Sequence, residues 1–430
     1  MDIAKRLKTK LNAIIANMSK EAQLYSAKGG NDFTRKRKWP FSRIIHFILS
    51  FGSQSLGTEI AAYFKYAKDF PTVSAFVQQR NKLSSSAMEH LYRTFTKTAE
   101  QRVRLYKKYR LLAIDGSDLS LPYNPKEDNV SGENHLSTLH LNGLYDVINK
   151  ACLDVVIQKG TEKNETGAAC QLVDRISDKY PVIILADRGY ESYNLFAHVE
   201  ERSFDYVIRI RGSNSIASGM GLPTSAEYDI TKNIIITRHS TGPAMVNREK
   251  YKYFSKGSRF DFIENSKCPD YEMTIRFVRF ELDNGQHELL ATSLPPELFS
   301  VSDLKDLYHL RWGVEIGFRE MKYIMGLSAF HSKKENSIIQ EIYARLTMYN
   351  FSMFIILFSR KKEIDPRNSS QVNFTQAVRF CLYFFRLSDT SPPFEVEATI
   401  DRFLLPVRAC RKFPRVRKSE SVVPFNYRLS

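Results

Sequence analysis

The stretch that most constrains this chain runs from Ser300 to Gly326, SVSDLKDLYHLRWGVEIGFREMKYIMG. Its apolar residues recur at the spacing of one helical face, which predicts a helix packed against a core. Ser300 with Asp303 three residues later predicts a capped start, and Gly326 predicts the end. The stretch therefore predicts one amphipathic helix. Its core-facing residues would be Leu307, Leu310, Val314, Phe318, Met321 and Met325.

A polar band lies beside this apolar face. At about 100° per residue, Tyr308, Arg311, Glu315 and Lys322 fall within about 60° of one another. One interpretation is a solvated face that carries an ordinary Arg311–Glu315 pair. The other is a chemical site, which requires further acidic residues from elsewhere in the chain.

The composition limits the class of protein and its partners. With 430 residues, 43% of them hydrophobic, the chain can form two or three domains with real cores. An excess of 63 Lys+Arg over 47 Asp+Glu gives a net charge of +16 and predicts a polyanionic partner such as nucleic acid; a generic basic protein is the alternative. The five cysteines form no CxxC pair, which favours a reduced cytoplasm over disulfides or a zinc site. The longest apolar run, residues 346–358, is too short for a membrane span.

Residues 1–105 are predicted to form a separate helical domain that binds DNA. Apolar residues recur at helical spacing throughout this region. Basic residues gather in two places, at Arg35, Lys36 and Arg37 and again at Arg80 and Lys82. These cations predict contacts with DNA phosphates. For the helix near Arg80, an exposed polar face on a packing helix is the alternative.

From about residue 106 short apolar runs replace the helical pattern, which predicts a mixed α/β unit over 106–211. The first buried strand, 111–114, ends at Asp115. Strands at 138–145 and 153–158 and a helix at 167–177 follow, and a buried strand at 182–185 leads into Asp187 and Arg188. A last strand runs to about Arg211.

The rest of the chain divides into three predicted regions. Residues 212–297 are β-rich, with a hairpin turn at 283–285. Residues 298–365 return to the α/β unit with the helix described first. Residues 366–430 are predicted to be helical and end in a basic tail that either contacts phosphates or is solvated.

The acidic residues of these regions suggest one reaction. Asp115 and Asp187 follow buried strands of one sheet, and Glu315 stands on a helix. Carboxylates that converge repel each other unless a cation binds, and hard oxygen ligands select Mg²⁺ or Mn²⁺. Two such ions about 4 Å apart can drive phosphodiester displacement. Alone, however, Asp115-Gly116 and Asp187-Arg188-Gly189 are more typical of turns, because Asp and Gly are turn formers.

Taken together, these residues identify a family resemblance. Tyr308, Arg311, Glu315 and Lys322 have the spacing of the Tyr-Arg-Glu-Lys signature of DDE transposases from bacterial insertion sequences. Asp115 in Asp-Gly-Ser and Asp187 in Asp-x-Gly-Tyr resemble the two other acids of that family. The resemblance covers residues 105–330 in detail and the whole chain in layout.

The resemblance implies a ribonuclease-H-like core, interrupted by the β-rich insertion and preceded by a helical DNA-binding domain. It implies that Asp115, Asp187 and Glu315 bind two Mg²⁺ or Mn²⁺ ions. Tyr308, Arg311 and Lys322 would then grip phosphates of the transposon end, with Arg188 beside them. The expected partners are the terminal inverted repeats and target DNA, with a homodimer in the synaptic complex, at the nucleoid in the cytoplasm.

Family members of this kind excise DNA through a hairpin, which calls for an aromatic side chain that holds a flipped base. Trp312 follows Arg311 and could stack on DNA, or it could pack in the core. The insertion supplies no tryptophan. Two alternatives to a transposase remain, a DNA-binding regulator that lacks catalysis and a ribonuclease-H-like nuclease.

Overall fold

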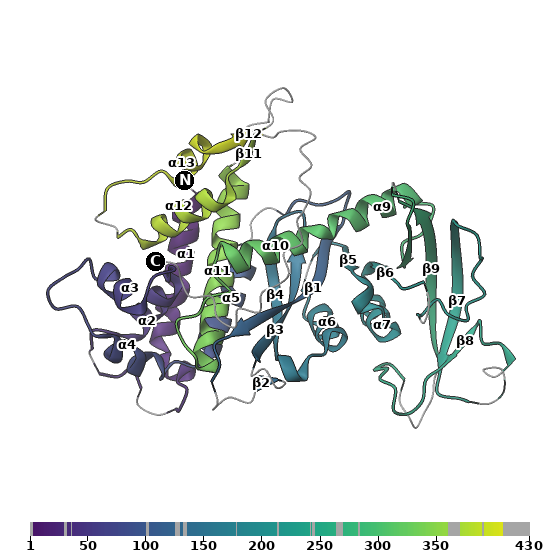
Figure 1. Cartoon of the computed structure of the whole chain (residues 1–430), viewed down its shortest axis with the longest axis horizontal. Coiled ribbons are helices and arrows are strands. Elements are labelled where there is room, and N and C mark those ends of the chain that lie inside the picture. The colour runs from purple at the N-terminus through teal and green to yellow at the C-terminus, as the bar shows by residue number, and fades with distance from the viewer. Residues whose placement is uncertain are drawn as a thin grey trace.

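The structure is a computed structural model that describes residues 3–29, 32–35, 37–99, 103–124, 130–131, 136–177, 179–212, 215–240, 242, 246–263, 270–282, 284–359, 370–388 and 391–406. The molecule is elongated (Figure 1). Helices from both ends of the chain form one end, and a sheet with helices on both faces forms the middle. The strands of the β-rich insertion form the other end.

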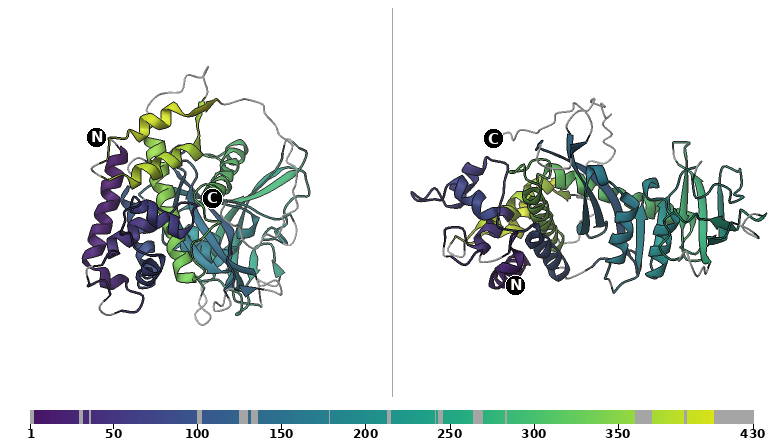
Figure 2. Two further views of the ribbon diagram at one scale, coloured as in Figure 1. Left: turned by 60° about the vertical axis from the view of Figure 1, so that its left-hand side comes forward. Right: turned by 90° about the horizontal axis from the view of Figure 1, so that it is seen from below.

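The helices of the first hundred residues do not form a core on their own. They are α1 (Ile3–Lys20), α2 (Phe41–Leu49), α3 (Leu56–Tyr63), α4 (Val73–Arg80) and α5 (Ser85–Ala99). α1, α2, α5, α12 (Phe374–Arg386) and α13 (Val396–Arg402) pack on α11 (Glu335–Ser359), while α4 packs on α2 and α3; Figure 2 gives two further views of this end of the molecule. Their buried side chains belong to one hydrophobic cluster, and the Ala4 amide donates to Glu397 Oε1 at 3.1 Å. The division at residues 105 and 366 stays a prediction.

The central sheet contains the strands that the sequence predicted for residues 106–211. These are β1 (Arg110–Leu121), β3 (Leu136–Asp146), β4 (Ala151–Lys159), β5 (Val182–Ala186) and β6 (Asp205–Arg209), with a short β2 (Val130–Ser131). In space the five long strands lie in the order β4-β3-β1-β5-β6. β1 is antiparallel to β3 and parallel to β5, which in turn is parallel to β6. The mixed α/β sheet is confirmed.

Helices cover both faces of this sheet. The predicted helix α6 (Glu165–Asp174) and the helix α7 (Tyr193–Glu201) contact β3, β4 and β6 and share a second hydrophobic cluster with them. On the other face lie α9 (Val301–Leu310) and α10 (Trp312–Tyr323), next to α11 and α5. Because side chains alternate along a strand, β1 sends Leu112 and Ile114 to the α6 face and Leu111 and Ala113 to the α10 face.

The insertion extends the core sheet. Its strands are β7 (Tyr228–Thr237), β8 (Tyr251–Tyr253), β9 (Tyr271–Glu281) and β10 (His287–Thr292). β10 pairs with β6, so that core and insertion form one ten-stranded sheet. β9 and β10 form the predicted hairpin, in which Gly285 has φ +77°, a conformation that favours glycine.

Two predicted boundaries were wrong. β1 continues beyond Asp115 to Leu121, because β3 pairs with it along this whole length while β5 pairs only as far as Ile114. The predicted helix over 300–326 is interrupted at Arg311, where the Arg311 amide donates to Tyr308 O and the Val314 amide donates to Arg311 O. Both bonds span three residues, which tightens the chain as in a 3₁₀ turn.

Other features of that helix were predicted correctly. Ser300 and Asp303 form a capping box, and Gly326 has a φ of +82° after α10 ends. The predicted core-facing residues are buried except Leu310, which is partly buried. Among the described residues, no helix is long and apolar enough to cross a membrane.

Candidate active site

The register of the two parallel strands places the aspartates side by side. Ile114 of β1 pairs with Ala186 of β5, so the next residues, Asp115 and Asp187, lie opposite each other where the pairing ends. Both follow residues of the α6 face and therefore lie on the α10 side. The Gly116 amide donates to Asp115 Oδ1 at 2.9 Å. The two carboxylates are thus fixed at one edge of the paired strands.

The interrupted helix brings the remaining predicted residues to these acids. Tyr308 is buried and its hydroxyl donates to Asp187 Oδ1 at 3.0 Å. The Arg311 guanidinium is 3% exposed and donates to Glu315 Oε1 at 2.9 Å. Its charge also acts on Asp115 and Asp187. One guanidinium therefore neutralises part of the charge of three carboxylates.

The two aspartates differ in pKa because their surroundings differ. Burial raises the pKa of Asp115 to about 6, although the Gly116 amide and Arg311 act in the opposite direction. Glu315 and Asp187 repel its charge and raise the pKa further. Burial also acts to raise the pKa of Asp187, but the Arg188 amide, Arg311 and Tyr308 together lower it below its ordinary value.

The donor set suits a hard divalent cation, but it is not assembled around one. Asp115, Asp187 and Glu315 offer only carboxylate oxygens, which Mg²⁺ and Mn²⁺ prefer. Within the described ranges, no three His, Cys, Asp or Glu side chains are arranged to hold a metal ion. Two polar atoms near the acids, Arg311 Nε and Tyr190 Oη, are buried without a hydrogen-bond partner. The donor chemistry of the site fits a metal, and Glu315 is the acid that Arg311 holds by a hydrogen bond.

Three other predicted residues lie near this cluster. Lys322 Nζ donates to the Asp118 carbonyl oxygen of β1 at 2.8 Å. Trp312 is 50% exposed, with the Arg311 guanidinium 5.2 Å from its ring centroid. Arg188 follows Asp187 and is exposed. All three could meet DNA that reaches the acids.

The residues of the first hundred that were predicted to contact DNA differ in their exposure. The predicted DNA contact of Arg80 was wrong. Arg80 is 3% exposed, and its Nη1 lies 3.1 Å from Oε1 of Glu341 in α11. Lys82 is partly exposed and lies 3.2 Å from Asp32, while Arg35 and Arg37 are exposed. Lys36 and the basic tail beyond 406 lie outside the described residues.

Comparison with known proteins identifies the family. The model of the "Transposase DDE domain" family matches residues 106–351, more than half of the chain. The chain belongs to the DDE transposase family. It is 23% identical, over 93% of its length and 89% of the relative, to the transposase InsG of insertion sequence element IS4 from Escherichia coli K12. A 65-residue segment is 35% identical to the transposase for insertion sequence element IS421 from Escherichia coli.

One solved structure is also similar. It is the cryo-EM structure of a piggyBac transposase synaptic complex with hairpin DNA, with a TM-score of 0.44 and 11% identity over 98% of this chain and 86% of that one. The family makes this chain a DNA-cleaving and strand-transferring enzyme.

The sequence interpretation missed a basic cavity beside the acids of this transposase. The cavity has a volume of about 840 Å³ and lies between β6, β9, β10 and residues 217–224. Arg209 in its wall has Nη1 3.9 Å from Asp187 Oδ1 and 3.5 Å from Glu288 Oε1. The arginines that line it are Arg188, Arg209, Arg211 and Arg279. The sequence did contain a signal for this basic cavity. Arg209 and Arg211 lie at the end of the predicted strand that follows Asp187, where they could be expected near the acids.

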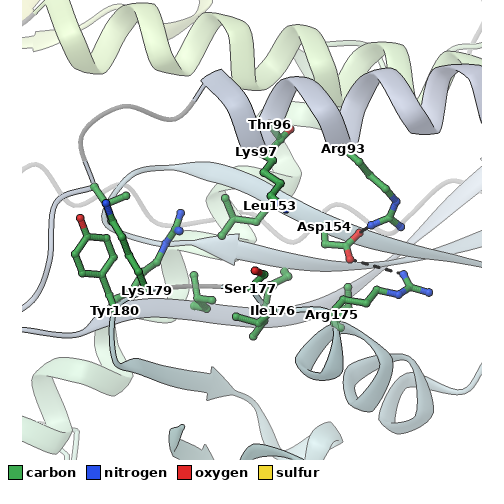
Figure 3. Close-up of a pocket in the computed structure, with 15 residues that line it drawn as sticks. Arg93, Thr96, Lys97, Leu153, Asp154, Arg175, Ile176, Ser177, Lys179 and Tyr180 are labelled. Carbon is green, nitrogen blue, oxygen red and sulfur yellow. Dashed lines mark hydrogen bonds and ion pairs between the residues drawn. The ribbon is translucent and has the colours of Figure 1, made fainter. Parts of the chain in front are cut away.

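A second cavity of about 620 Å³ lies between α5 and α6 (Figure 3). Its floor includes Leu112 and Leu144, on the sheet face opposite to the acids. Arg93 and Arg175 point into it from two helical segments, and both bind Asp154 (Figure 3). Two of its cations are therefore already paired, and the cavity does not contribute to the transposase site.

Aromatic side chains of the insertion pack mainly with each other. The Phe260 ring contacts Phe254, Phe262 and Tyr271, and Phe260 is 3% exposed. Tyr253 is the exception, at 51% exposure. Trp39 is buried in the helical core, so that Trp312 is the exposed tryptophan.

Proposed function

We propose that this transposase binds the terminal inverted repeats of an insertion sequence and performs metal-dependent cleavage and strand transfer through Asp115, Asp187 and Glu315. The observation that carries the proposal is the register of β1 and β5, which sets Asp115 opposite Asp187 on the face where α10 presents Glu315. The strands lie in the order β4-β3-β1-β5-β6. β1, β5 and β6 are parallel to one another and β3 is antiparallel to β1, which supports a ribonuclease-H-like core.

Asp115, Asp187 and Glu315 would hold the ions, which we propose to be two Mg²⁺ or Mn²⁺. When bound, such ions activate a water or a 3′-hydroxyl and stabilise the leaving oxygen. An ion bound at Glu315 Oε1 would displace the hydrogen bond from Arg311. A DNA phosphate is a suitable new partner for the freed guanidinium, because arginine binds phosphates with two parallel hydrogen bonds.

The remaining residues of the site would position the DNA. Lys322 and Arg188 supply cations on either side of the acids, and Tyr308 supplies a hydroxyl donor. Trp312 is exposed next to them and would stack on an unpaired base, which is the role that a hairpin step requires. Cut-and-paste transposition through a hairpin is therefore part of the proposal.

The proposal extends to partners and location. Two transposon ends have to be joined in one complex, so a homodimer is expected on double-stranded DNA. Lys82, Arg35 and Arg37 are exposed or partly exposed cations that could contact the repeats, and Lys36 belongs to the same basic segment. Such a protein would act in the cytoplasm, at the nucleoid.

One experiment separates this proposal from the two alternatives. The protein is incubated with Mg²⁺ and a supercoiled plasmid that carries the coding frame with its native flanking DNA. Cuts at both borders of the element support the transposase, whereas binding of the borders without cleavage supports a regulator that lacks catalysis. Cleavage of an RNA/DNA hybrid in preference to the plasmid supports a nuclease and contradicts the proposal.

A further inference from the structure

A buried histidine lies behind the strand that carries Asp115. His140 of β3 is 1% exposed. Its Nδ1 is 2.5 Å from Asp118 Oδ1 of β1, and its Nε2 is 3.2 Å from Glu165 Oε1 at the start of α6. Lys163 Nζ is 3.2 Å from the same Glu165 oxygen. The imidazole ring is therefore hydrogen-bonded to Asp118, while its Nε2 lies near Glu165 without a hydrogen bond.

The ring and the Glu165 carboxylate leave no room for a side chain at Gly116. A methyl group added to this glycine would stand 2.5 Å from His140 Nε2 and 2.8 Å from Glu165 Oε1, distances that real side chains do not adopt. Gly116 pairs with Asn142 of β3, so His140 reaches it as a diagonal neighbour across the strands. Two side chains thus lie close behind the backbone that immediately follows Asp115.

One hydrogen bond links Gly116 to the Asp115 carboxylate on the other face of the sheet. The Gly116 amide, which donates to Asp115 Oδ1, belongs to the residue that His140 and Glu165 approach. Glu165 Oε2 would also lie 3.8 Å from a methyl group on Gly189, two residues after Asp187. One carboxylate thus approaches the backbone that follows each of the two aspartates.

We propose that His140 and Glu165 are positioning residues for DNA cleavage, which fix the Gly116 peptide and thereby orient the Asp115 carboxylate. Both would act through the Gly116 peptide and not directly on DNA or the reacting atoms. The inference rests on the proposed function, because it takes Asp115 to be a catalytic residue.

The test is a double-mutant cycle between Gly116 and His140. Cleavage of the plasmid with native flanking DNA is measured at saturating protein, together with binding of the flanking DNA and the melting temperature. Gly116→Ala is expected to slow cleavage by about tenfold with binding changed less than about twofold, because it displaces the Asp115 peptide. His140→Ala alone is expected to slow cleavage several-fold. The double variant is expected to cleave at about the rate of His140→Ala, and therefore faster than Gly116→Ala, because removal of the ring makes room for the methyl group.

His198 provides a matched control. It too is nearly buried and bridges two carboxylates, with Nδ1 2.8 Å from Asp174 Oδ1 and Nε2 3.0 Å from Asp261 Oδ2, but it does not contact Gly116. His198→Ala is expected to lower the melting temperature without rescuing Gly116→Ala. Rescue by this variant as well would show a general effect and overturn the inference.

Two further results would overturn the inference. One is a double Gly116/His140 variant that is slower than either single variant, since the losses would then be independent. The other is normal cleavage by Gly116→Ala. An Asp115→Asn variant run in parallel separates this failure from failure of the proposed function: only the latter predicts cleavage by Asp115→Asn.

Discussion

The buried pair of Arg80 and Glu341 gives a quantitative test of the structural role that replaces the predicted DNA contact. Arg80 donates to Gln340 Oε1 at 3.0 Å, to Glu341 Oε1 at 3.1 Å and to Ser337 O at 2.6 Å. The side chains of Arg80 and Glu341 are 4% and 0% exposed. Arg80→Met would leave the Glu341 charge buried without this partner, which typically costs about 3–5 kcal/mol.

Unfolding in guanidinium chloride measures the loss in the free energy of unfolding, and the fluorescence of Trp39 follows the transition. The Trp39 ring lies 4.9 Å from the Phe76 ring of α4, the helix that ends at Arg80. In a Trp312→Phe background, Trp39 is the single tryptophan of the chain. Adding Glu341→Gln to Arg80→Met is expected to recover part of the stability, because the uncompensated charge is removed.

Lys82→Ala serves as the surface control. The partly exposed Lys82–Asp32 pair at 3.2 Å is expected to contribute less than about 1 kcal/mol. If Arg80→Met lowers the free energy of unfolding by no more than Lys82→Ala does, the reasoning is refuted. A variant of normal stability that binds the flanking DNA more weakly would also refute it, since Arg80 would then contact DNA after all.

Three further predictions concern the catalytic helix and the acid stability. Gly317→Ala is expected to lower both cleavage and the melting temperature, because its methyl group would stand 2.6 Å from the Tyr145 ring, whereas Gly313→Ala meets Val147 at 3.4 Å and should be tolerated. Equal effects of the two would contradict this. Lys322→Ala is expected to reduce the salt dependence of DNA binding by about one phosphate contact, and an unchanged slope of log K against log salt would argue against that contact. The pKa of Glu341 is about 2, against an ordinary value of 4.5: burial acts to raise it, but Arg80 and His331 lower it. The folded state therefore gains stability above pH 4.5, roughly 3 kcal/mol, which is lost as the pH falls towards 2. Acid titration of unfolding should show this loss in the wild type and a smaller one in Glu341→Gln.

The sequence predicted the elements whose patterns are local. The apolar runs before Asp115 and Asp187, the capping box at Ser300 and the hairpin at Gly285 follow from periodicity and turn chemistry, and the structure confirms them. The resemblance predicted which three acids belong together. The placement of Asp115 opposite Asp187 agrees with that prediction.

The features that the sequence did not predict depend on contacts between distant segments. Arg80 looks like an exposed cation until α11 places Glu341 against it, 261 residues away in the chain. The break at Arg311 has no helix-breaking residue at its position, and it coincides with burial of the Arg311 guanidinium beside acids of other elements. His140 carried no signal either, because its partners Asp118 and Glu165 come from β1 and α6.

The most direct test of the central claim is cleavage by three isosteric variants, Asp115→Asn, Asp187→Asn and Glu315→Gln. Each is assayed with Mg²⁺ on the plasmid that carries the native flanking DNA, and binding of that DNA is measured in parallel. Each substitution removes one carboxylate charge and should abolish cleavage while DNA binding persists, because the acids serve the chemistry and the surrounding cations serve the binding. Cleavage at the wild-type rate by any one of the three would contradict the assignment of the active site.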